Sequence, residues 1–321
     1  MAESHFPIVL SINDRFAAPC GVVIASACAT CVTPALLRFH VYSTDLSESS
    51  RRMLAALAEP HGASVTFHVS DASRVKHVPR MKNVSVDSHV RLLIPEDFPD
   101  EERILYLDAD VLVLRDVLAL QNVPLEDAIV AVAPNGPAPF IEDFNRIHGR
   151  PPGTPLFNAG VMLLQPRLWI EARIAERSVE WLIANEAKLI FRNQDALNIL
   201  LQDRLRWLNA IWNVESRLYR EWLLGYGPSS PLVDMAAVLH YTGGDKPWIP
   251  GRYVCWQSRY NRHLEDCRRA MRRTGGDVHR LPRRWTALDH VAAAANVAVV
   301  GARVRLGALK PTRPSDGTEA T

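Results

Sequence analysis

The chain has 321 residues, 48% of them hydrophobic and 22% charged, which suits one or two soluble globular domains with a large core. Its five cysteines are an odd number spread from Cys20 to Cys267, which argues against a secreted disulfide framework. The longest apolar run, residues 291–302, is too short to cross a bilayer, and the opening apolar stretch lacks the flanks of a signal peptide, so we expect a cytoplasmic protein.

Strands and helices are predicted to alternate through the first half of the chain. Strict alternation in the strand 64–69 is expected to point Val65, Phe67 and Val69 inward, and Pro95 is expected to end a helix. This alternation predicts an α/β fold, a mostly parallel sheet with helices on both faces, and ligands at the carboxyl ends of the strands. The expected elements are strand 7–12, helix 21–30, strand 37–43, helix 46–59, strand 64–69, helix 85–94 and strand 103–107.

The second half of the chain is mixed. The segment 133–155 contains six prolines and is long for a connection, which favours a functional loop over a linker. The expected elements are strand 128–133, strand 155–164, a single amphipathic helix over 168–187 and a short helix over 193–203. A last strand is expected within the stretch 236–242 and ends at His240.

Two aspartates interrupt a buried strand in the stretch RILYLDADVLVLRD (103–116). Residues two apart in a strand point the same way, so Asp108 and Asp110 are expected to converge just past its end. Converging carboxylates repel each other, and a divalent cation relieves that repulsion. A D-x-D pair alone is a weak signal, but its position after four apolar residues strengthens it.

Three further segments follow in order: FNAGVML (157–163), FRNQDALN (191–198) and HYTGGDKPW (240–248). Together with ILYLDADVLV, they closely resemble the retaining glycosyltransferases of family 8, over residues 6–248. This group includes bacterial lipopolysaccharide galactosyl- and glucosyltransferases and glycogenin. The resemblance implies a GT-A-type nucleotide-sugar-binding domain and a UDP-hexose donor bound with manganese.

The resemblance implies that Asp108, Asp110 and His240 are the metal ligands. From the residues alone, two carboxylates and an imidazole suit Mn²⁺ better than Mg²⁺, which is the alternative cation. A lone histidine at a strand end is otherwise a hydrogen-bonded structural residue. The G-G-x-K that follows favours the ligand interpretation, because the backbone at Gly243 can approach a diphosphate closely and Lys246 supplies a positive charge.

Donor contacts are also implied by the resemblance. Asn13 and Asp14 would bind the uracil edge and ribose, with an Asx turn as the alternative. The buried amide of Asn158 needs partners that sugar hydroxyls would provide, and Arg91 would lie near the donor or pair with Asp108. The implied donor-binding residues are Ser11, Asn13, Asp14, Arg15, Arg91, Asp108, Ala109, Asn158, Asn193, Gly243 and Lys246.

Gln194 and Asp195 match catalytic positions of the family. Because an amide is a poor nucleophile, we expect attack from the leaving-group face, with the departing phosphate taking the acceptor's proton and Gln194 stabilising the cationic sugar. Asp195 is expected mainly to position. The predicted reaction transfers galactose or glucose to a saccharide or glycolipid acceptor, as in lipopolysaccharide biosynthesis.

Two alternatives stay open. A sugar nucleotidyltransferase typically has a Gly-rich loop after the first strand, which SINDRFAAPCG (residues 11–21) lacks. A nucleotide-sugar binder without turnover is the other alternative, and the presence of all three metal ligands argues against it.

The net charge of +2 hides a basic C-terminal segment. Residues 259–313 contain 13 lysines and arginines against four acids, a surplus of nine that leaves the rest of the chain at about −7. With Trp285 and an apolar run, this segment is expected to attach to an anionic membrane surface, with a solvated helix as the alternative. No nucleic-acid recognition fold accompanies the charge.

We expect a catalytic domain over 1–250, a basic helical segment over 251–310 and a disordered tail over 311–321. Donor chemistry is expected to survive truncation after Gln257.

Overall fold

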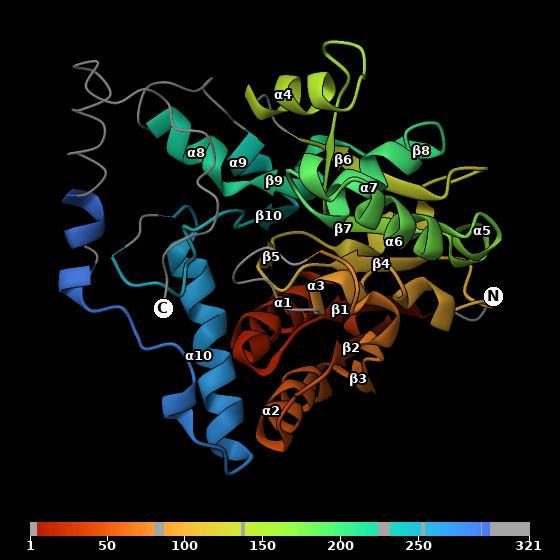
Figure 1. The fold of residues 1–321 in the computed structure, drawn as a ribbon. Coiled ribbons are helices and arrows are strands. Elements are labelled where there is room, and N and C mark those ends of the chain that lie inside the picture. Colours follow the sequence, from red (N-terminus) through yellow and green to blue (C-terminus); the bar gives the residue numbers. More distant parts are fainter. Residues whose placement is uncertain are drawn as a thin grey trace.

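The computed structural model of the protein describes residues 5–79, 87–135, 139–223, 232–251, 254–289 and 291–295. A seven-stranded sheet with the order β3-β2-β1-β4-β7-β6-β8 runs through its middle (Figure 1). β1 pairs in parallel with β2 and β4, β2 with β3, and β6 with β8, whereas β7 is antiparallel to β4 and β6. The predicted mostly parallel sheet is therefore confirmed. Its strands are β1 Phe6–Ser11, β2 Leu37–Ser43, β3 Ser64–Val69, β4 Ile104–Leu107, β6 Val130–Pro134, β7 Phe157–Leu164 and β8 Leu205–Trp207.

Helices cover both faces of this sheet (Figure 1). Side chains alternate across each strand, so in β4 Leu105 and Leu107 pack into one hydrophobic cluster while Ile104 and Tyr106 pack into the other. Each fully buried leucine contributes about 2 kcal/mol. The first cluster includes residues of α1 Ala17–Thr30, α2 Glu48–Ala58 and α10 Gln257–Arg273, and the second includes residues of α5 Pro166–Glu171, α6 Ile174–Ala184 and α7 Asn193–Leu200.

A second, three-stranded sheet has the order β5-β10-β9, formed by β5 Val111–Val113, β10 Val238–His240 and β9 Val214–Glu215. In it His240 lies opposite Val111 of the antiparallel β5 and beside Glu215 of the parallel β9. The chain leaves the large sheet at Leu107 and enters the small sheet at Val111. Residues 108–110 form the turn between the two sheets, and this crossing positions the site described below.

Two predicted helices differ from the structure. The helix predicted over 85–94 is described only as α3 Asp87–Val90, and Pro95 lies inside the first turn of a 3-10 helix, where its missing N–H costs little. The single helix predicted over 168–187 is broken into α5 and α6 at Arg173. That residue has a φ of 51°, and its N–H bonds to the Ile170 carbonyl at 2.9 Å, which ends α5.

Two predictions about exposure and loops were also wrong in part. Val65 and Phe67 pack partly against the core as expected, but Val69 is 77% exposed at the end of β3, which is an edge strand of the sheet. The functional loop predicted over 133–155 contains α4 Pro139–Ile147, which begins with proline as helices tolerate. The remaining helices are α8 Ser216–Leu223 and α9 Leu232–Met235.

α10 belongs to the hydrophobic core, although it lies in the segment predicted to follow the catalytic domain. Tyr260, Leu264 and Met271 are buried in the cluster that also contains residues of α1 and α2. Arg273 at its end donates to the Ala56 carbonyl at 2.6 Å. In the part of the chain that the structure describes, no helix is both long and apolar enough to cross a membrane. The predicted tail over 311–321 lies outside the described residues.

Candidate active site

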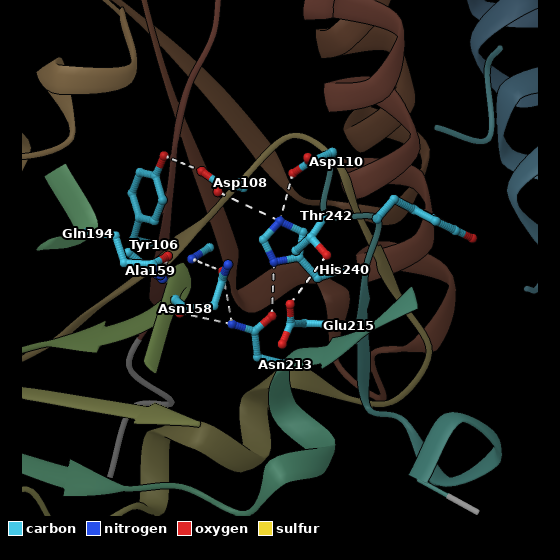
Figure 2. Close-up of polar contacts among 12 residues, drawn as sticks. Tyr106, Asp108, Asp110, Asn158, Ala159, Gln194, Asn213, Glu215, His240 and Thr242 are labelled. Atoms are coloured by element: carbon cyan, nitrogen blue, oxygen red, sulfur yellow. Dashed lines mark hydrogen bonds and ion pairs between the residues drawn. The ribbon is translucent and has the colours of Figure 1, made fainter. Parts of the chain in front are cut away.

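Asp108, Asp110 and His240 converge where the two sheets meet (Figure 2). Each residue offers one ligand atom, and these atoms lie within 4.8 Å of one another. His240 Nε2 is 3.1 Å from Asp110 Oδ1 and 3.8 Å from Asp108 Oδ2. The predicted convergence of the two carboxylates is present, but a turn between two sheets produces it rather than the alternation of a single strand.

Cationic groups compensate the charge of these carboxylates. Lys246 Nζ lies 2.5 Å from Asp110 Oδ2, and Arg91 Nη2 lies 2.8 Å from Asp108 Oδ1. Burial would raise the pKa of Asp110, but attraction to Lys246 and His240 outweighs it and holds that pKa well below the usual range. Burial likewise opposes a charge on His240, but its attraction to Asp110 prevails and raises its pKa.

The start of β7 connects this cluster to Gln194. Asn158 Oδ1 accepts the Gly160 N–H at 2.8 Å, and Gln194 Oε1 accepts the Ala159 N–H at 3.1 Å. Figure 2 places Asn158 and Gln194 on the same side of the cluster as Tyr106. Asn158 and Gln194, which were predicted from different motifs, are therefore both held by residues 158–160 of β7.

Asp195 holds the segment that precedes α7. Its carboxylate is fully buried and accepts the N–H groups of Ile190 at 2.6 Å and Phe191 at 2.8 Å. Burial raises the pKa of Asp195 to about 7, although the backbone N–H groups favour its charged form. Asn193, the first residue of α7, is also buried.

The loop after β1 is tied to two other parts of the chain. Asp14 accepts hydrogen bonds from the Ser47 hydroxyl at 2.8 Å and the Ser50 hydroxyl at 2.7 Å, and its other oxygen lies 2.9 Å from Arg280. Asn13 Oδ1 is buried and has no hydrogen-bond partner among the described residues. The side chain of Arg15 is exposed, and Ser11 is the last residue of β1.

The turn after β10 comes close to the same loop. Gly243 has a φ of +74°, and a Cβ atom added there would meet nothing within 4 Å, so its backbone is open to a ligand. Trp248 lies edge-on to Phe16 with ring centroids 5.9 Å apart, and Lys246 Nζ is 5.8 Å from the Trp248 ring. The loop after β1 was predicted to bind the nucleoside, and the turn after β10 to bind the diphosphate. An aromatic contact between Phe16 and Trp248 links these two parts of the chain.

Four residues near the cluster were not singled out from the sequence: Tyr106, Gly160, Asn213 and Glu215. Asn213 Oδ1 lies 3.0 Å from His240 Nδ1, and the buried Glu215 pairs with Arg217 at 3.0 Å. Asn213 and Glu215 occur in the stretch WNVES, where polar residues mix with apolar ones. The same signal drew attention to Asn158 and would have indicated this stretch as well. Ala109, which was predicted to contact the donor, lies between Asp108 and Asp110 in the sequence and is buried.

Comparisons with known proteins agree with this arrangement. The family model "Glycosyl transferase family 8" matches residues 7–250. Lipopolysaccharide 1,3-galactosyltransferase of Salmonella typhimurium is 29% identical over 249 residues, which cover 76% of this chain and 73% of that protein. Lipopolysaccharide glucosyltransferase WaaO of Escherichia coli is 26% identical over 75% of this chain and 72% of its own length.

A solved structure shares the fold. The crystal structure of the galactosyltransferase LgtC, in complex with donor and acceptor sugar analogs, superposes with a TM-score of 0.70 and 26% identity. The match covers 81% of this chain and 95% of that one. The fold is therefore of the GT-A type predicted from the sequence, and the chain belongs to glycosyl transferase family 8.

Proposed function

We propose that the protein transfers a hexose, galactose or glucose, from a UDP-sugar to a saccharide or glycolipid acceptor with retention of configuration. The convergence of Asp108, Asp110 and His240 beside Gln194 carries this proposal. The galactosyl- and glucosyltransferase relatives support the hexose and suggest an acceptor of the lipopolysaccharide type.

The cluster fits a divalent cation. Two carboxylate oxygens and an imidazole nitrogen face one another, and this mixed set favours Mn²⁺ over Mg²⁺. Asp108, Asp110 and His240 would hold the ion. When bound, it supplies Lewis-acid neutralisation of the departing diphosphate.

The donor would lie between the loop after β1 and the turn after β10. Asn13, whose Oδ1 is buried without a partner in the described structure, would bind the uracil or ribose. The open backbone at Gly243 and the charge of Lys246 would bind the diphosphate. Asp14 already accepts two serine hydroxyls, so we propose that it mainly orders this loop.

Gln194 and Asp195 would have different tasks at the sugar. Ala159 fixes the amide oxygen of Gln194, which would stabilise positive charge developing on the sugar. The departing phosphate would take the acceptor's proton on the same face. The carboxylate of Asp195 accepts the N–H groups of Ile190 and Phe191 instead of facing the sugar. Asp195 would therefore orient the helix that carries Gln194.

A donor panel tests the proposed reaction. Purified protein is incubated with UDP-galactose, UDP-glucose, UDP-N-acetylglucosamine and GDP-mannose, each with Mn²⁺, Mg²⁺ or a chelator. Hydrolysis of the donor and thermal stabilisation are measured. We expect hydrolysis of a UDP-hexose that requires the cation. Equal hydrolysis in the chelator, or preference for the GDP-sugar, would contradict the proposal.

We also propose peripheral attachment to an anionic membrane surface through the segment after α10. Leu288 and Val291 are 79% and 65% exposed, and they follow Arg283 and Arg284, which pair with Asp289 and Glu265, in the same segment. Exposed apolar side chains in a basic segment suit the interface of a charged bilayer. Such a surface would bring a glycolipid acceptor to the enzyme.

Vesicle co-sedimentation tests this attachment. We expect the protein to sediment with phosphatidylglycerol vesicles and the double variant Leu288→Asp/Val291→Asp to stay in solution. Val32→Asp is the matched control, because Val32 is 86% exposed but lies outside the segment. High salt should release only part of the protein, since screening weakens charge contacts but not apolar insertion. Equal sedimentation of the double variant would exclude this segment.

A further inference from the structure

Each oxygen of Asp108 has a different environment. Oδ1 accepts the Tyr106 hydroxyl at 2.8 Å and lies 2.8 Å from Arg91 Nη2. Oδ2 faces His240 Nε2 at 3.8 Å and lies 3.4 Å from Arg91 Nη1, a longer contact than the one to Oδ1. Tyr106 is fully buried in β4, so its hydroxyl has little freedom to move. Tyr106 and Arg91 thus occupy one oxygen and turn the other toward the cluster.

The ring of His240 is oriented in a comparable way. Its Nδ1 lies 3.0 Å from Asn213 Oδ1, and the amide nitrogen of Asn213 donates to the Asn158 carbonyl at 3.0 Å. That second bond decides which end of the amide faces the ring, so the histidine nitrogen beside it must be the donor. His240 Nε2 is then the nitrogen that faces Asp108 and Asp110 (Figure 2).

We propose that Tyr106 and Asn213 are positioning residues that select the ligand atoms offered to the divalent cation, Oδ2 of Asp108 and Nε2 of His240. The proposal rests on the metal dependence proposed above. Residues behind the ligands typically change metal affinity by about 10–100-fold when they are lost, because they fix the ligand's orientation and, for histidine, its tautomer.

Asn213 also connects the metal ligands to the sugar side of the site. It is anchored on Asn158, and the next residue, Ala159, holds Gln194. The N–H of Asp108 bonds to the Gly160 carbonyl at 2.8 Å. Residues 158–160 of β7 therefore set the position of His240, Asp108 and Gln194 together, and Asn213 is the contact through which His240 joins them.

Binding of Mn²⁺, measured from the electron paramagnetic resonance signal of the free ion, tests the proposal. The full-length wild type, Tyr106→Phe and Asn213→Ala are titrated without a sugar nucleotide and again with UDP. We expect each variant to raise the Kd for Mn²⁺ by about 10–100-fold. Tyr106→Phe keeps the ring over which Arg91 lies at 4.9 Å, so only the hydroxyl is removed.

Matched controls separate positioning from general loss of stability. Tyr42→Phe removes another buried tyrosine hydroxyl that donates to an aspartate, Asp97 at 2.9 Å, away from the cluster. Asn145→Ala removes another buried amide, which donates to the Thr154 carbonyl at 3.0 Å. Both controls should bind Mn²⁺ like the wild type even if their melting temperatures fall as far as those of the test variants.

Asn213→Asp is the rescue variant. A carboxylate still accepts the His240 Nδ1–H but cannot donate to the Asn158 carbonyl, so the Mn²⁺ affinity should lie between that of Asn213→Ala and that of the wild type. A purely structural role predicts that this variant is as weak as Asn213→Ala.

Two outcomes separate the two proposals. If the wild type binds Mn²⁺ and both test variants bind it equally well, Tyr106 and Asn213 do not select ligand atoms and this inference is overturned. If the wild type does not bind Mn²⁺ with or without UDP, the proposed metal dependence fails, and this inference fails with it.

Discussion

Gly160 lies so close to His240 that a Cβ atom at position 160 would come within 2.1 Å of the imidazole Cε1. The same atom would lie 2.9 Å from Asp108 Oδ2. His240 of β10 and Asp108 of the turn between the two sheets can therefore meet over β7 only because this position has no side chain. The glycine of FNAGVML is a requirement of the site's geometry rather than of the backbone conformation, since its φ is not positive.

Gly160→Ala should displace His240 and Asp108 from each other. A shift of about 1 Å in a catalytic group typically lowers the rate about 100-fold, so we expect metal-dependent donor hydrolysis to fall by about that factor. Hydrolysis at saturating Mn²⁺ and the melting temperature are measured together. Gly276→Ala is the stability control, because a Cβ atom there would also meet a side chain at 2.1 Å, Met271 Sδ, but away from the cluster. Undiminished hydrolysis would show that the two ligands need not converge.

Asp110→Asn should abolish metal-dependent hydrolysis of the donor while leaving the fold intact. The substitution keeps the shape of the side chain but removes the charge that Lys246 and His240 compensate. Hydrolysis is measured at limiting Mn²⁺, and circular dichroism reports the fold. Asp97→Asn serves as a control for a hydrogen-bonded aspartate outside the cluster. Activity equal to the wild type at limiting Mn²⁺ would exclude this site.

Gln194→Ala should lower kcat far more than it weakens UDP binding. The amide oxygen is fixed by Ala159 beside the cluster, where it would act on charge that develops only in the transition state. Steady-state kinetics and the Kd of UDP are measured for both proteins. An unchanged kcat with a raised KM would instead make Gln194 a residue of ground-state binding.

Asp195 should make stability depend on pH. Burial raises the pKa of Asp195 to about 7, from an ordinary value near 4. Between pH 4 and pH 7, the folded chain therefore keeps a proton on Asp195 that the unfolded chain has lost. Its contribution is present at low pH and is lost as the pH rises to about 7, at about 1.4 kcal/mol per pH unit. Urea unfolding of the wild type and Asp195→Asn is compared from pH 5 to pH 8. The difference in unfolding free energy should decline up to about pH 7 and then level off. A difference that does not vary with pH would contradict the assignment.

Truncation after Gln257 should prevent folding. The charge distribution suggested that donor chemistry survives this cut, but α10 buries Tyr260, Leu264 and Met271 in the core. Each such side chain contributes about 1.5–3 kcal/mol, and a whole domain is stable by only about 5–15 kcal/mol. Truncation after Ala295 keeps α10 and should leave cooperative unfolding and hydrolysis in place. A folded, active chain ending at Gln257 would show that α10 is dispensable.

The sequence by itself was sufficient for the fold class and for the residues of the cluster. Alternating strands and helices predict the sheet because apolar runs and side-chain periodicity are local properties of the chain. β1 and β4 are short buried apolar runs, and β2 begins with buried and partly exposed side chains in alternation. Asp108 and Asp110 stood out because carboxylates beside an apolar strand need compensation. Ordered motifs then linked them with His240, about 130 residues away in the chain.

Only the tertiary structure decided how those residues meet. The crossing from β4 to β5 between two sheets, the break at Arg173 and the exposure of Val69 depend on which elements pack together, and local sequence does not encode that. Basic charge suggested that α10 stands apart, but its buried face is matched by α1 and α2. Asn213 gains its role from a histidine on a neighbouring strand, since a hydrogen bond to a ligand becomes visible only when both partners have been placed in space.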